Sequence, residues 1–357
     1  MKILFLINGL GLGNSTRCHA VIQRLHAKGA EVEVATSGNG LWYFSDKTEV
    51  TKVYEIESLS YGSKKGTINM LRTFASILSS FSVVYRNSKR IGGILDQSKT
   101  NIVVTDSIYN FIPMKRRGIK VVSLNNADIV WHSYFYFKNR PNSIKFQFYG
   151  IEMFDFLIHK LMSDYVISPC LLSNLPKPGE NTIRVGPIVR NGLRPKNTSM
   201  PEKSAVVMLS GSVFGTPINF SNRAYPMKID VVGRNEPKNW VGTNNINFHG
   251  RIRNTFDLLN KADLAVVNGG FSAVSEIFWL GLPMVVVPVP GHAEQWINAK
   301  TIERLGLGLI ATTENYEDIM LEVFSRIQEF KLNYEKIEHQ KDGAEQSALS
   351  ITRLLTS

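Results

Sequence analysis

The residues best placed to do chemistry lie between positions 265 and 299, where a glycine turn follows a short apolar run. Gly269 and Gly270 let the backbone approach a ligand closely, because neither has a side chain. The apolar spacing over 272–280 predicts a helix, and the free N–H groups at its start favour an anion such as phosphate. Glu276 lies about one turn into this helix, near enough to accept hydrogen bonds from a sugar hydroxyl. Together these residues indicate a site for a phosphorylated sugar.

Apolar runs at 264–267 and 284–287 predict buried parallel strands on either side of this helix. Ligands of open α/β folds bind at the carboxyl ends of the strands, so the polar loop expected after the second strand would reach the same site. His292 in that loop would contact phosphate or cap the loop, and the sequence favours neither role. The other polar residues of the loop are Glu294, Gln295 and Asn298.

Length and cysteine content limit the class of protein. A chain of 357 residues can form two domains with substantial cores, and 43% hydrophobic with 20% charged residues is typical of a globular protein. Cys18 and Cys170 match no metal or disulfide pattern, which suits a reducing compartment. The apolar run at 3–7 is too short for a signal peptide, and no run reaches the ~18 residues of a membrane span. We therefore expect a cytoplasmic protein.

The positive charge is concentrated in the first half of the chain. Residues 1–186 contain 23 Lys and Arg against 13 Asp and Glu, whereas the rest contains 18 against 17. Basic and aromatic residues alternate over 64–120 and again over 131–162, which suits an anionic membrane surface or nucleic acid. An ordinary basic face over a core helix is the alternative. The two differ in whether four apolar side chains point outward: Phe74, Ile77, Leu78 and Phe81.

The order of predicted elements indicates two doubly wound parallel sheets of the α/β class. Helices are expected at 15–27, about 67–95, up to Met114, 255–259, 272–280, 317–330 and 345–355. Strands are expected at 3–7, 31–36, 53–56, 102–106, 120–124, 166–168, 183–185, 205–209, 228–232, 246–249, 264–267, 284–287 and within 304–312.

Turn-forming residues divide this series into domains. A first Rossmann-like domain would span 1–186, and a linker rich in glycine, proline and asparagine would span 187–203. A second Rossmann-like domain would span 204–340, facing the first across a cleft. The last helix, in 341–357, would pack back on the first domain.

With these elements placed, the chain resembles the two-Rossmann-domain (GT-B) glycosyltransferases. It is most similar to the MurG-like branch, which is itself similar to the UDP-glycosyltransferases in the second domain. One motif behind the resemblance is Gly269-Gly270-x-Ser272 with Glu276, followed by Gly281-Leu282-Pro283 and Glu294-Gln295, which is close to the donor signature of that family. The other is the run Asn8–Arg17 after the first strand, which is similar to the acceptor-side glycine loop.

The resemblance implies a role for each matching residue. Backbone N–H and hydroxyl groups near two turns would bind the donor diphosphate, Glu276 would hold the ribose, and Glu294 with Gln295 would hold the transferred sugar. Phe248 to Ile252 would flank the base. The implied donor residues are Ser210, Gly211, Ser212, Phe248, Ile252, Gly269, Gly270, Phe271, Ser272, Glu276, His292, Glu294 and Gln295; the acceptor-side residues are Gly11, Gly13, Asn14 and Arg17.

One position departs from the family, because Asn14 stands where a histidine is usual, and asparagine cannot act as a general base. Asp106, at the end of a strand, is the best replacement by position, with His19 as a second candidate and Asp128 with His132 as weaker ones. Asp106 could instead cap a helix, and His19 could be a buried helix residue. Glu276 could also merely brace its own helix.

These residues favour an inverting transfer of a sugar from a nucleotide diphosphate, expected to be a UDP-sugar, to a hydroxyl acceptor. Helix N-termini can stabilise the leaving group, and the sequence places no acidic pair to hold Mg²⁺, so we expect neither metal nor cofactor. A lipid-linked acceptor at the inner face of an anionic membrane would suit the basic first half. No nucleic-acid partner is expected.

Three other functions are alternatives to a glycosyltransferase. A nucleotide-sugar epimerase of the same fold and a non-catalytic nucleotide-sugar-binding protein remain alternatives. A nicotinamide enzyme is disfavoured, because Gly-x-Gly-x-x-Gly fails in both registers, with Asn14 or Thr16 at the last position.

Overall fold

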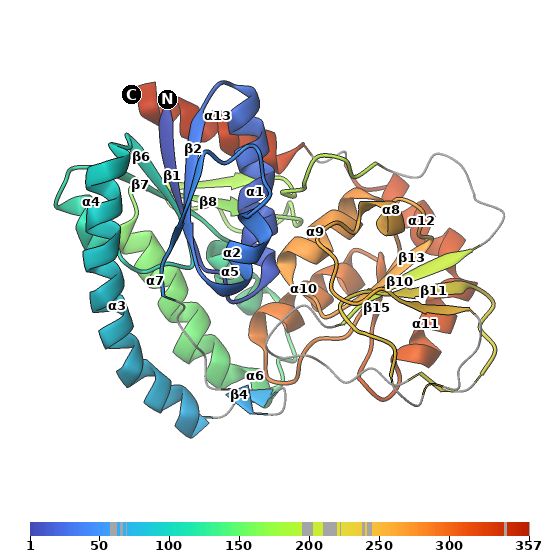
Figure 1. Cartoon of the computed structure of the whole chain (residues 1–357). Helices are drawn as coiled ribbons and strands as arrows, with labels where there is room; N and C mark the ends of the chain where they lie inside the picture. The colour runs from blue at the N-terminus through green and yellow to red at the C-terminus, as the bar shows by residue number, and fades with distance from the viewer. Residues whose placement is uncertain are drawn as a thin grey trace. The chain divides into compact units, whose positions relative to one another are not determined.

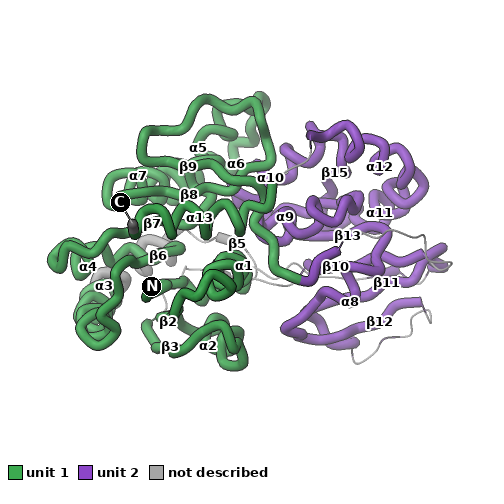
Figure 2. The backbone as a smooth tube through the Cα atoms, turned by 90° about the horizontal axis from the view of Figure 1, so that it is seen from above, with its two compact units in different colours: residues 1–191, 341–357 green, residues 192–340 purple. Residues whose placement is uncertain are grey.

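The computed structural model describes the chain apart from residues 58–62, 65–66, 69, 195–202, 210–219, 222, 238–239, 241–244, 339–340 and 357, and apart from the side chains of 58–81 and 356. The described residues form two compact units, 1–191 with 341–357 and 192–340 (Figure 2). The chain enters the second unit after Asn191, within the segment expected to be a linker.

The first unit is built on a parallel sheet of seven strands in the order β3-β2-β1-β6-β7-β8-β9. The central strands read as unbroken apolar runs because helices cover both faces of the sheet; Ile3 to Ile7 are fully buried. The strand order reverses at β1, so a crevice is expected beside its carboxyl end. The strands are β1 Lys2–Ile7, β2 Glu31–Thr36, β3 Lys52–Glu55, β6 Ile102–Asp106, β7 Lys120–Leu124, β8 Tyr165–Pro169 and β9 Thr182–Val185; a separate antiparallel pair is β4 Ser63–Lys64 and β5 Thr67–Ile68.

Helices from both ends of the chain cover this sheet. The C-terminal helix α13 packs beside α1 (Figure 1), where Ala348 and Ile351 share a core with Cys18 and Val21. The helices are α1 Leu12–Ala27, α2 Gly38–Phe44, α3 Met70–Ser98, α4 Ile112–Lys115, α5 Ala127–Tyr136, α6 Asn142–Gln147, the π-helix η1 Phe148–Glu152, α7 Met153–Met162 and α13 Gly343–Thr356.

The second unit is built on a parallel sheet of six strands in the order β12-β11-β10-β13-β14-β15. Its strands are β10 Ser204–Met208, β11 Lys228–Val231, β12 Ile246–Phe248, β13 Leu264–Val267, β14 Met284–Val286 and β15 Gly308–Ile310. Its helices are α8 Phe256–Leu259, α9 Phe271–Trp279, α10 Ala293–Arg304, α11 Tyr316–Ser325 and α12 Ile327–Glu335. The doubly wound parallel arrangement predicted from the sequence is thus confirmed in both units.

The prediction of a polar loop after β14 is wrong, because residues 293–304 form the helix α10. Residues 295 to 299 of this helix are all buried. A helix buried on most sides shows no apolar period in its sequence, so a periodicity argument cannot detect it. The single helix expected over 317–330 is also wrong, since α11 and α12 meet at Arg326.

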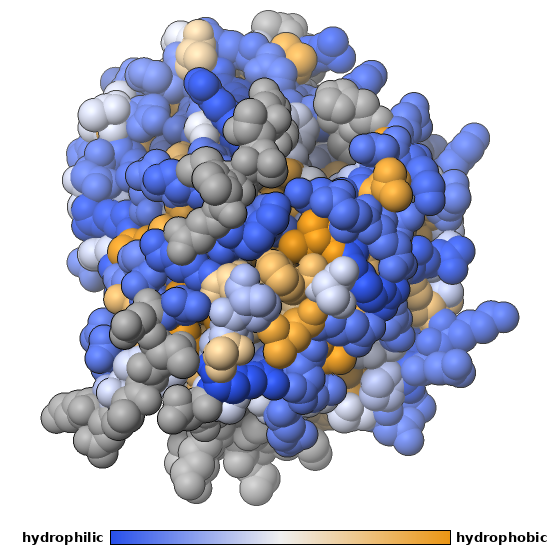
Figure 3. Space-filling view, turned by 90° about the vertical axis from the view of Figure 1, so that its right-hand side faces the viewer, coloured by the Kyte–Doolittle hydropathy of each residue, from blue (hydrophilic) through white to orange (hydrophobic). Residues whose placement is uncertain are grey.

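One face of the molecule is largely hydrophilic (Figure 3). Figure 3 shows one face on which hydrophilic residues surround apolar ones that gather near the centre. Among the described residues, no helix combines the length and the apolar character needed to cross a bilayer.

Candidate functional site

The glycine turn after β13 is held by two neighbouring elements. Gly269 has a φ of +86°, and a Cβ at this position would lie 3.0 Å from the Gln295 carbonyl oxygen and 2.9 Å from the Val286 side chain. Asn298 of α10 is buried and donates from Nδ2 to the Gly269 carbonyl at 2.8 Å. Residue 269 therefore has to be glycine, and Asn298 braces the turn, a role that its expected place in a loop did not reveal.

The helix after this turn begins with open backbone donors. Gly270 is the N-cap of α9 in an extended conformation, and among the described residues no side chain caps the helix. A Cβ at Gly270 would meet no atom of the described residues within 4 Å. Phe271 is buried, and Ser272 follows it in the first turn of α9. This geometry suits an anion.

Glu276 adds a carboxylate to the same helix. Glu276 is buried, with 7% of the residue exposed. It lies five residues beyond the first residue of α9. A buried carboxylate close to an open helix start is suited to accept hydrogen bonds from the hydroxyls of a ligand whose phosphates occupy that start.

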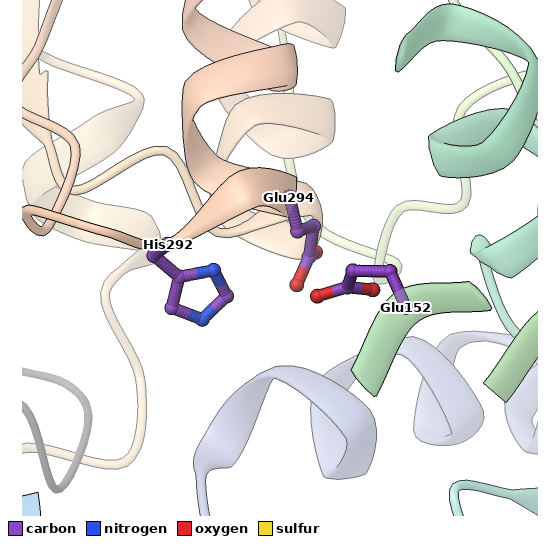
Figure 4. A group of neighbouring side chains, drawn as sticks. All are labelled: Glu152, His292 and Glu294. Atoms are coloured by element: carbon purple, nitrogen blue, oxygen red, sulfur yellow. The ribbon is translucent and has the colours of Figure 1, made fainter. Parts of the chain in front are cut away.

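His292, Glu294 and Gln295 lie at the start of α10. His292 takes the N-cap position, although its side chain does not cap the helix, and Glu294 lies in the first turn (Figure 4). The Gln295 Oε1 accepts a hydrogen bond from the Val289 N–H at 2.9 Å. The side-chain oxygen of Gln295 therefore holds the segment after β14, and contact of this residue with the transferred sugar stays a prediction.

Side-chain contacts hold the end of β12. Phe248 is partly buried and packs against Phe220 and Trp240, and the expected main-chain contacts of this segment with a base stay a prediction. Asp230 lies 2.7 Å from the Nε2 of His249 and accepts from the Asn247 amide at 3.2 Å. Ile252 is partly exposed. Ser210, Gly211 and Ser212 lie outside the described residues.

A buried ion pair occupies the switch point of the first unit. Arg17 of α1 donates from Nη2 to Asp106 Oδ1 at 2.7 Å and from Nε to Oδ2 at 3.0 Å. Its remaining donors reach the Oδ1 atoms of Asn14 and Asn126, each at 3.4 Å. Arg17 is 5% exposed and Asp106 is fully buried. The sequence placed Arg17 and Asn14 on the acceptor side but did not reveal this pairing.

Asp106 does not have the geometry of a general base. Both carboxylate oxygens bind the Arg17 guanidinium, and no part of the residue is exposed, so a substrate proton has no access to it. The alternative helix cap is also wrong, because the next helix, α4, has Phe111 as its N-cap. Asp106 anchors Arg17 instead.

His19 is a buried helix residue. Its Nδ1 lies 3.0 Å from the Tyr43 hydroxyl and its ring packs edge-on against Phe44, both in α2. Burial lowers the pKa of His19 to about 4, and Glu49 only partly offsets this effect. So weak a base, enclosed by aromatic rings, does not fit proton transfer from a substrate at neutral pH.

The remaining candidates for a general base, Asp128 and His132, lie away from the switch point. Asp128 binds Arg184 of β9 at 2.8 Å and lies 3.3 Å from the Nε2 of His132. Burial lowers the pKa of His132, and Asp128 opposes this effect. Because β9 is the outermost strand, three places from β6, this pair belongs to the edge of the sheet.

The glycine loop after β1 is packed against the turn before α2. A Cβ on Gly9 would lie 1.6 Å from the Ser37 carbonyl oxygen, and Asn39 donates from Nδ2 to the Leu10 carbonyl at 2.7 Å. Gly11 is the extended N-cap of α1, with no capping side chain among the described residues and open space around its Cα; Gly13 is exposed. Gly9 is therefore structural, while Gly11 and Gly13 lie at an open helix start.

An apolar surface covers α5 to α7 in the first unit. Phe154, Leu157 and Leu161 of α7 are 57%, 40% and 73% exposed, and their spacing of three and four residues puts them on one face of the helix. Exposed apolar side chains on the preceding segments are Phe135, Phe146 and Tyr149, and exposed lysines are Lys138, Lys145 and Lys160. Phe74, Ile77, Leu78 and Phe81 lie outside the described side chains.

Comparison with known proteins places the chain among glycosyltransferases. The sequence profile of the family described as glycosyl transferase family 1 matches residues 1–327. An uncharacterized glycosyltransferase of Methanosarcina mazei is 25% identical over 94% of this chain and 92% of its own length. A UDP-N-acetylglucosamine–N-acetylmuramyl-(pentapeptide) pyrophosphoryl-undecaprenol N-acetylglucosamine transferase of Thermosipho africanus is 38% identical over 16% of this chain and 18% of its own length.

Solved structures show the same fold. The spinosyn forosaminyltransferase SpnP superposes with a TM-score of 0.65 at 14% identity and covers 100% of both chains. LpCGTa, solved in complex with UDP, superposes with a TM-score of 0.64 at 12% identity, and the alignment covers 100% of this chain and 99% of that chain. The fold is therefore that of the GT-B glycosyltransferases.

Proposed function

The chain belongs to glycosyl transferase family 1, and from this premise we propose that it transfers a sugar from a UDP-sugar to a hydroxyl acceptor with inversion. The acceptor would be lipid-linked and presented at the cytoplasmic face of an anionic membrane. Family membership makes the chain a glycosyltransferase. The donor, the acceptor and the inversion are what we propose.

The observation that carries the proposal is the start of α9. Its uncapped N–H groups and the open space beside Gly270 suit a diphosphate, and buried Glu276 on the same helix suits ribose hydroxyls. As the bond from sugar to phosphate breaks, negative charge grows on the departing diphosphate. Preorganised backbone donors stabilise that charge without reorganising, which lowers the barrier.

A uridine nucleotide is favoured by two of the similar proteins. One solved neighbour holds UDP, and one relative is named as a transferase of N-acetylglucosamine from its UDP form. The name of the same relative also includes an undecaprenol-linked substrate, which supports a lipid-linked acceptor for this chain. On the acceptor side, Asn14, fixed by Arg17, would contact the acceptor.

A screen of nucleotide sugars by thermal shift, followed by an assay of nucleotide release, tests the donor. We expect a UDP-sugar to raise the melting temperature, because a ligand that binds only the folded state stabilises it by mass action. Glu276→Gln should lower the rate of nucleotide release at least about tenfold, since a hydrogen bond to a charged group contributes ~1.5–3 kcal/mol.

The exposed residue Glu314 offers a matched control. Glu314→Gln should leave both the melting temperature and the rate of nucleotide release unchanged. A wild-type protein that binds UDP-sugars without turnover would indicate a binding protein, and conversion of the donor sugar without an acceptor would indicate an epimerase.

The exposed apolar side chains and lysines on the surface over α5 to α7 support docking to a membrane. We expect the protein to co-sediment with vesicles that contain phosphatidylglycerol and to be released by salt. Leu157→Ser with Leu161→Ser should weaken this binding, whereas Leu332→Ser, at an exposed leucine of the second unit, should not. Equal binding to neutral vesicles, unaffected by salt, would contradict the docking proposal.

A further inference from the structure

A small cavity in the first unit lies among α5, α7, β8 and β9. Polar walls are formed by Asn125, Asp128 and His159, and apolar walls include Phe156 and Val166. The cavity has room for about one water molecule. None of these residues has a part in the proposed transfer of a sugar.

One wall carries a buried imidazole nitrogen that lacks a partner. His159 is 1% exposed, and its Nδ1 lies 2.9 Å from the Asp155 carbonyl oxygen and 3.0 Å from the Asp155 carboxylate. Because both neighbours of Nδ1 are acceptors, Nδ1 carries a proton and donates it. Nε2, at the other end of the ring, is buried and makes no hydrogen bond to any described residue.

A second wall carries a buried amide that lacks a partner on one side. Asn125 is 1% exposed, and its Oδ1 accepts a hydrogen bond from the Ala127 N–H at 3.0 Å, which fixes the orientation of the amide. Its Nδ2 is buried and has no acceptor among the described residues. Buried polar atoms are nearly always satisfied by protein or by ordered water, so two such atoms on one water-sized cavity require an explanation.

We propose that a single internal water molecule occupies this cavity and hydrogen-bonds to His159 Nε2, Asn125 Nδ2 and the Asp128 carboxylate. The water would accept from the asparagine amide and donate to the carboxylate, and its third bond would join the imidazole. Three partners is the usual number for a buried water. This arrangement satisfies both unpartnered nitrogens at once.

The charges around the cavity favour water over an ion. Burial alone would lower the pKa of His159, but the Asp155 carboxylate outweighs it and raises the pKa above its usual range, with Asp106 acting in the same direction. Nε2 is a donor when the ring is charged and an acceptor when it is neutral, and a water molecule can turn to suit either state. A cation would be opposed by Lys160 on the wall, and an anion by Asp128.

The water would hold the turn between β7 and α5. Asn125 accepts a hydrogen bond from the Ala127 N–H at the start of α5, and the next residue, Asn126, accepts one from Arg17 at 3.4 Å. A water bound to Asn125 and His159 thus joins α7 to the turn that reaches the switch point. This role does not depend on which sugar, if any, the chain transfers.

A high-resolution crystal structure of the whole chain tests the proposal directly. We expect one ordered water within hydrogen-bonding distance of His159 Nε2, Asn125 Nδ2 and an Asp128 oxygen. A dry cavity, a bound ion, or protein atoms bonded to both nitrogens would overturn the proposal.

A double-mutant cycle in urea tests it independently. If Asn125→Ala and His159→Leu remove partners of the same water, the combined shift of the unfolding midpoint should be smaller than the sum of the single shifts. The control is Asn87→Ala, at a buried asparagine whose amide is satisfied by the Glu57 backbone. Its shift should add to that of His159→Leu; additivity in both cycles would count against the shared water, and the crystal structure decides if a variant does not fold.

Discussion

The glycine turn after β1 and the glycine turn after β13 each lead into a helix whose start no described side chain caps. In both, a glycine packs so closely on a carbonyl oxygen that a Cβ would collide: Gly9 against Ser37, and Gly269 against Gln295. In both, an asparagine from another element donates to the turn, Asn39 in the first unit and Asn298 in the second. The glycine turns of the two units thus share one backbone arrangement. We therefore expect the side chains around each turn to determine which ligand binds there.

The side chains differ in charge and in how they are satisfied. At the first turn, the Arg17 charge is neutralised within the protein by Asp106, and its other donors go to two asparagine oxygens. The two helix starts are themselves alike, because neither first turn contains an acidic residue and no described atom lies within 4 Å of a Cβ placed on either N-cap glycine. What distinguishes the first turn is the Arg17–Asp106 ion pair, in which both charged groups are already satisfied. On the proposed function, the second turn would bind the diphosphate and the first the neutral acceptor.

The largest effect that separates the two turns should come from Arg17→Ala. This variant leaves the Asp106 carboxylate buried without its partner, and breaking a buried pair costs about 3–5 kcal/mol. We expect the free energy of unfolding, measured in urea, to fall by that amount, whereas Glu276→Gln in the second unit should change it far less.

Arg86→Ala serves as the control for Arg17, because Arg86 pairs with Glu57 at an exposed position. Its stability should stay close to that of the wild type. If Arg17→Ala were equally harmless, the ion pair would not be the anchor of the first turn.

A smaller effect should appear in acid, and His19 is its source in the first unit. His19 of α1 has its pKa lowered to about 4 by burial, against an ordinary value of 6.5. The unfolded state therefore binds more protons between pH 6.5 and 4, and stability that is present above 6.5 is lost as the pH falls through this window. The loss for this group is about 3 kcal/mol.

Urea denaturation of the wild type and of His19→Gln across that pH range measures this effect. The difference in unfolding free energy between the two proteins should change with pH by about the amount expected for this one group. A constant difference would show that His19 is not held in its neutral form by burial.

The residues of the second turn are close together in the sequence, whereas those of the first turn are not. Gly269, Gly270 and Glu276 are close in the chain, so their arrangement follows from one strand, one turn and one helix. Arg17 and Asp106 are 89 residues apart, and only the adjacency of β1 and β6 brings them together. From the sequence alone the two residues therefore receive separate roles, Arg17 on the acceptor side and Asp106 as a candidate base, whereas the structure pairs them.

Elements buried on most sides escaped prediction as well. Strands such as β1 and β13 were found because an apolar run of four to six residues is itself the signal. α10 has polar residues, Gln295 and Asn298, facing inward as braces for backbone groups, so its sequence resembles a loop. α2, which encloses His19, is short and starts with three glycine and asparagine residues that are typical of turns.

The smallest expected change in stability comes from substitutions at two adjacent glycines, which also test whether a ligand binds at the second turn. Gly269 has a φ of +86° and lacks room for a Cβ, whereas Gly270 has a φ of −61° and open space around it. Gly269→Ala should lower the free energy of unfolding by about 1–2 kcal/mol from the left-handed backbone alone, with the steric clash adding to it. Gly270→Ala should leave stability nearly unchanged but weaken the binding of UDP, measured by calorimetry, because its methyl group enters the space beside the helix start. If both variants bound UDP like the wild type, the diphosphate could not lie at the start of α9, and the comparison between the two turns would lose its functional meaning.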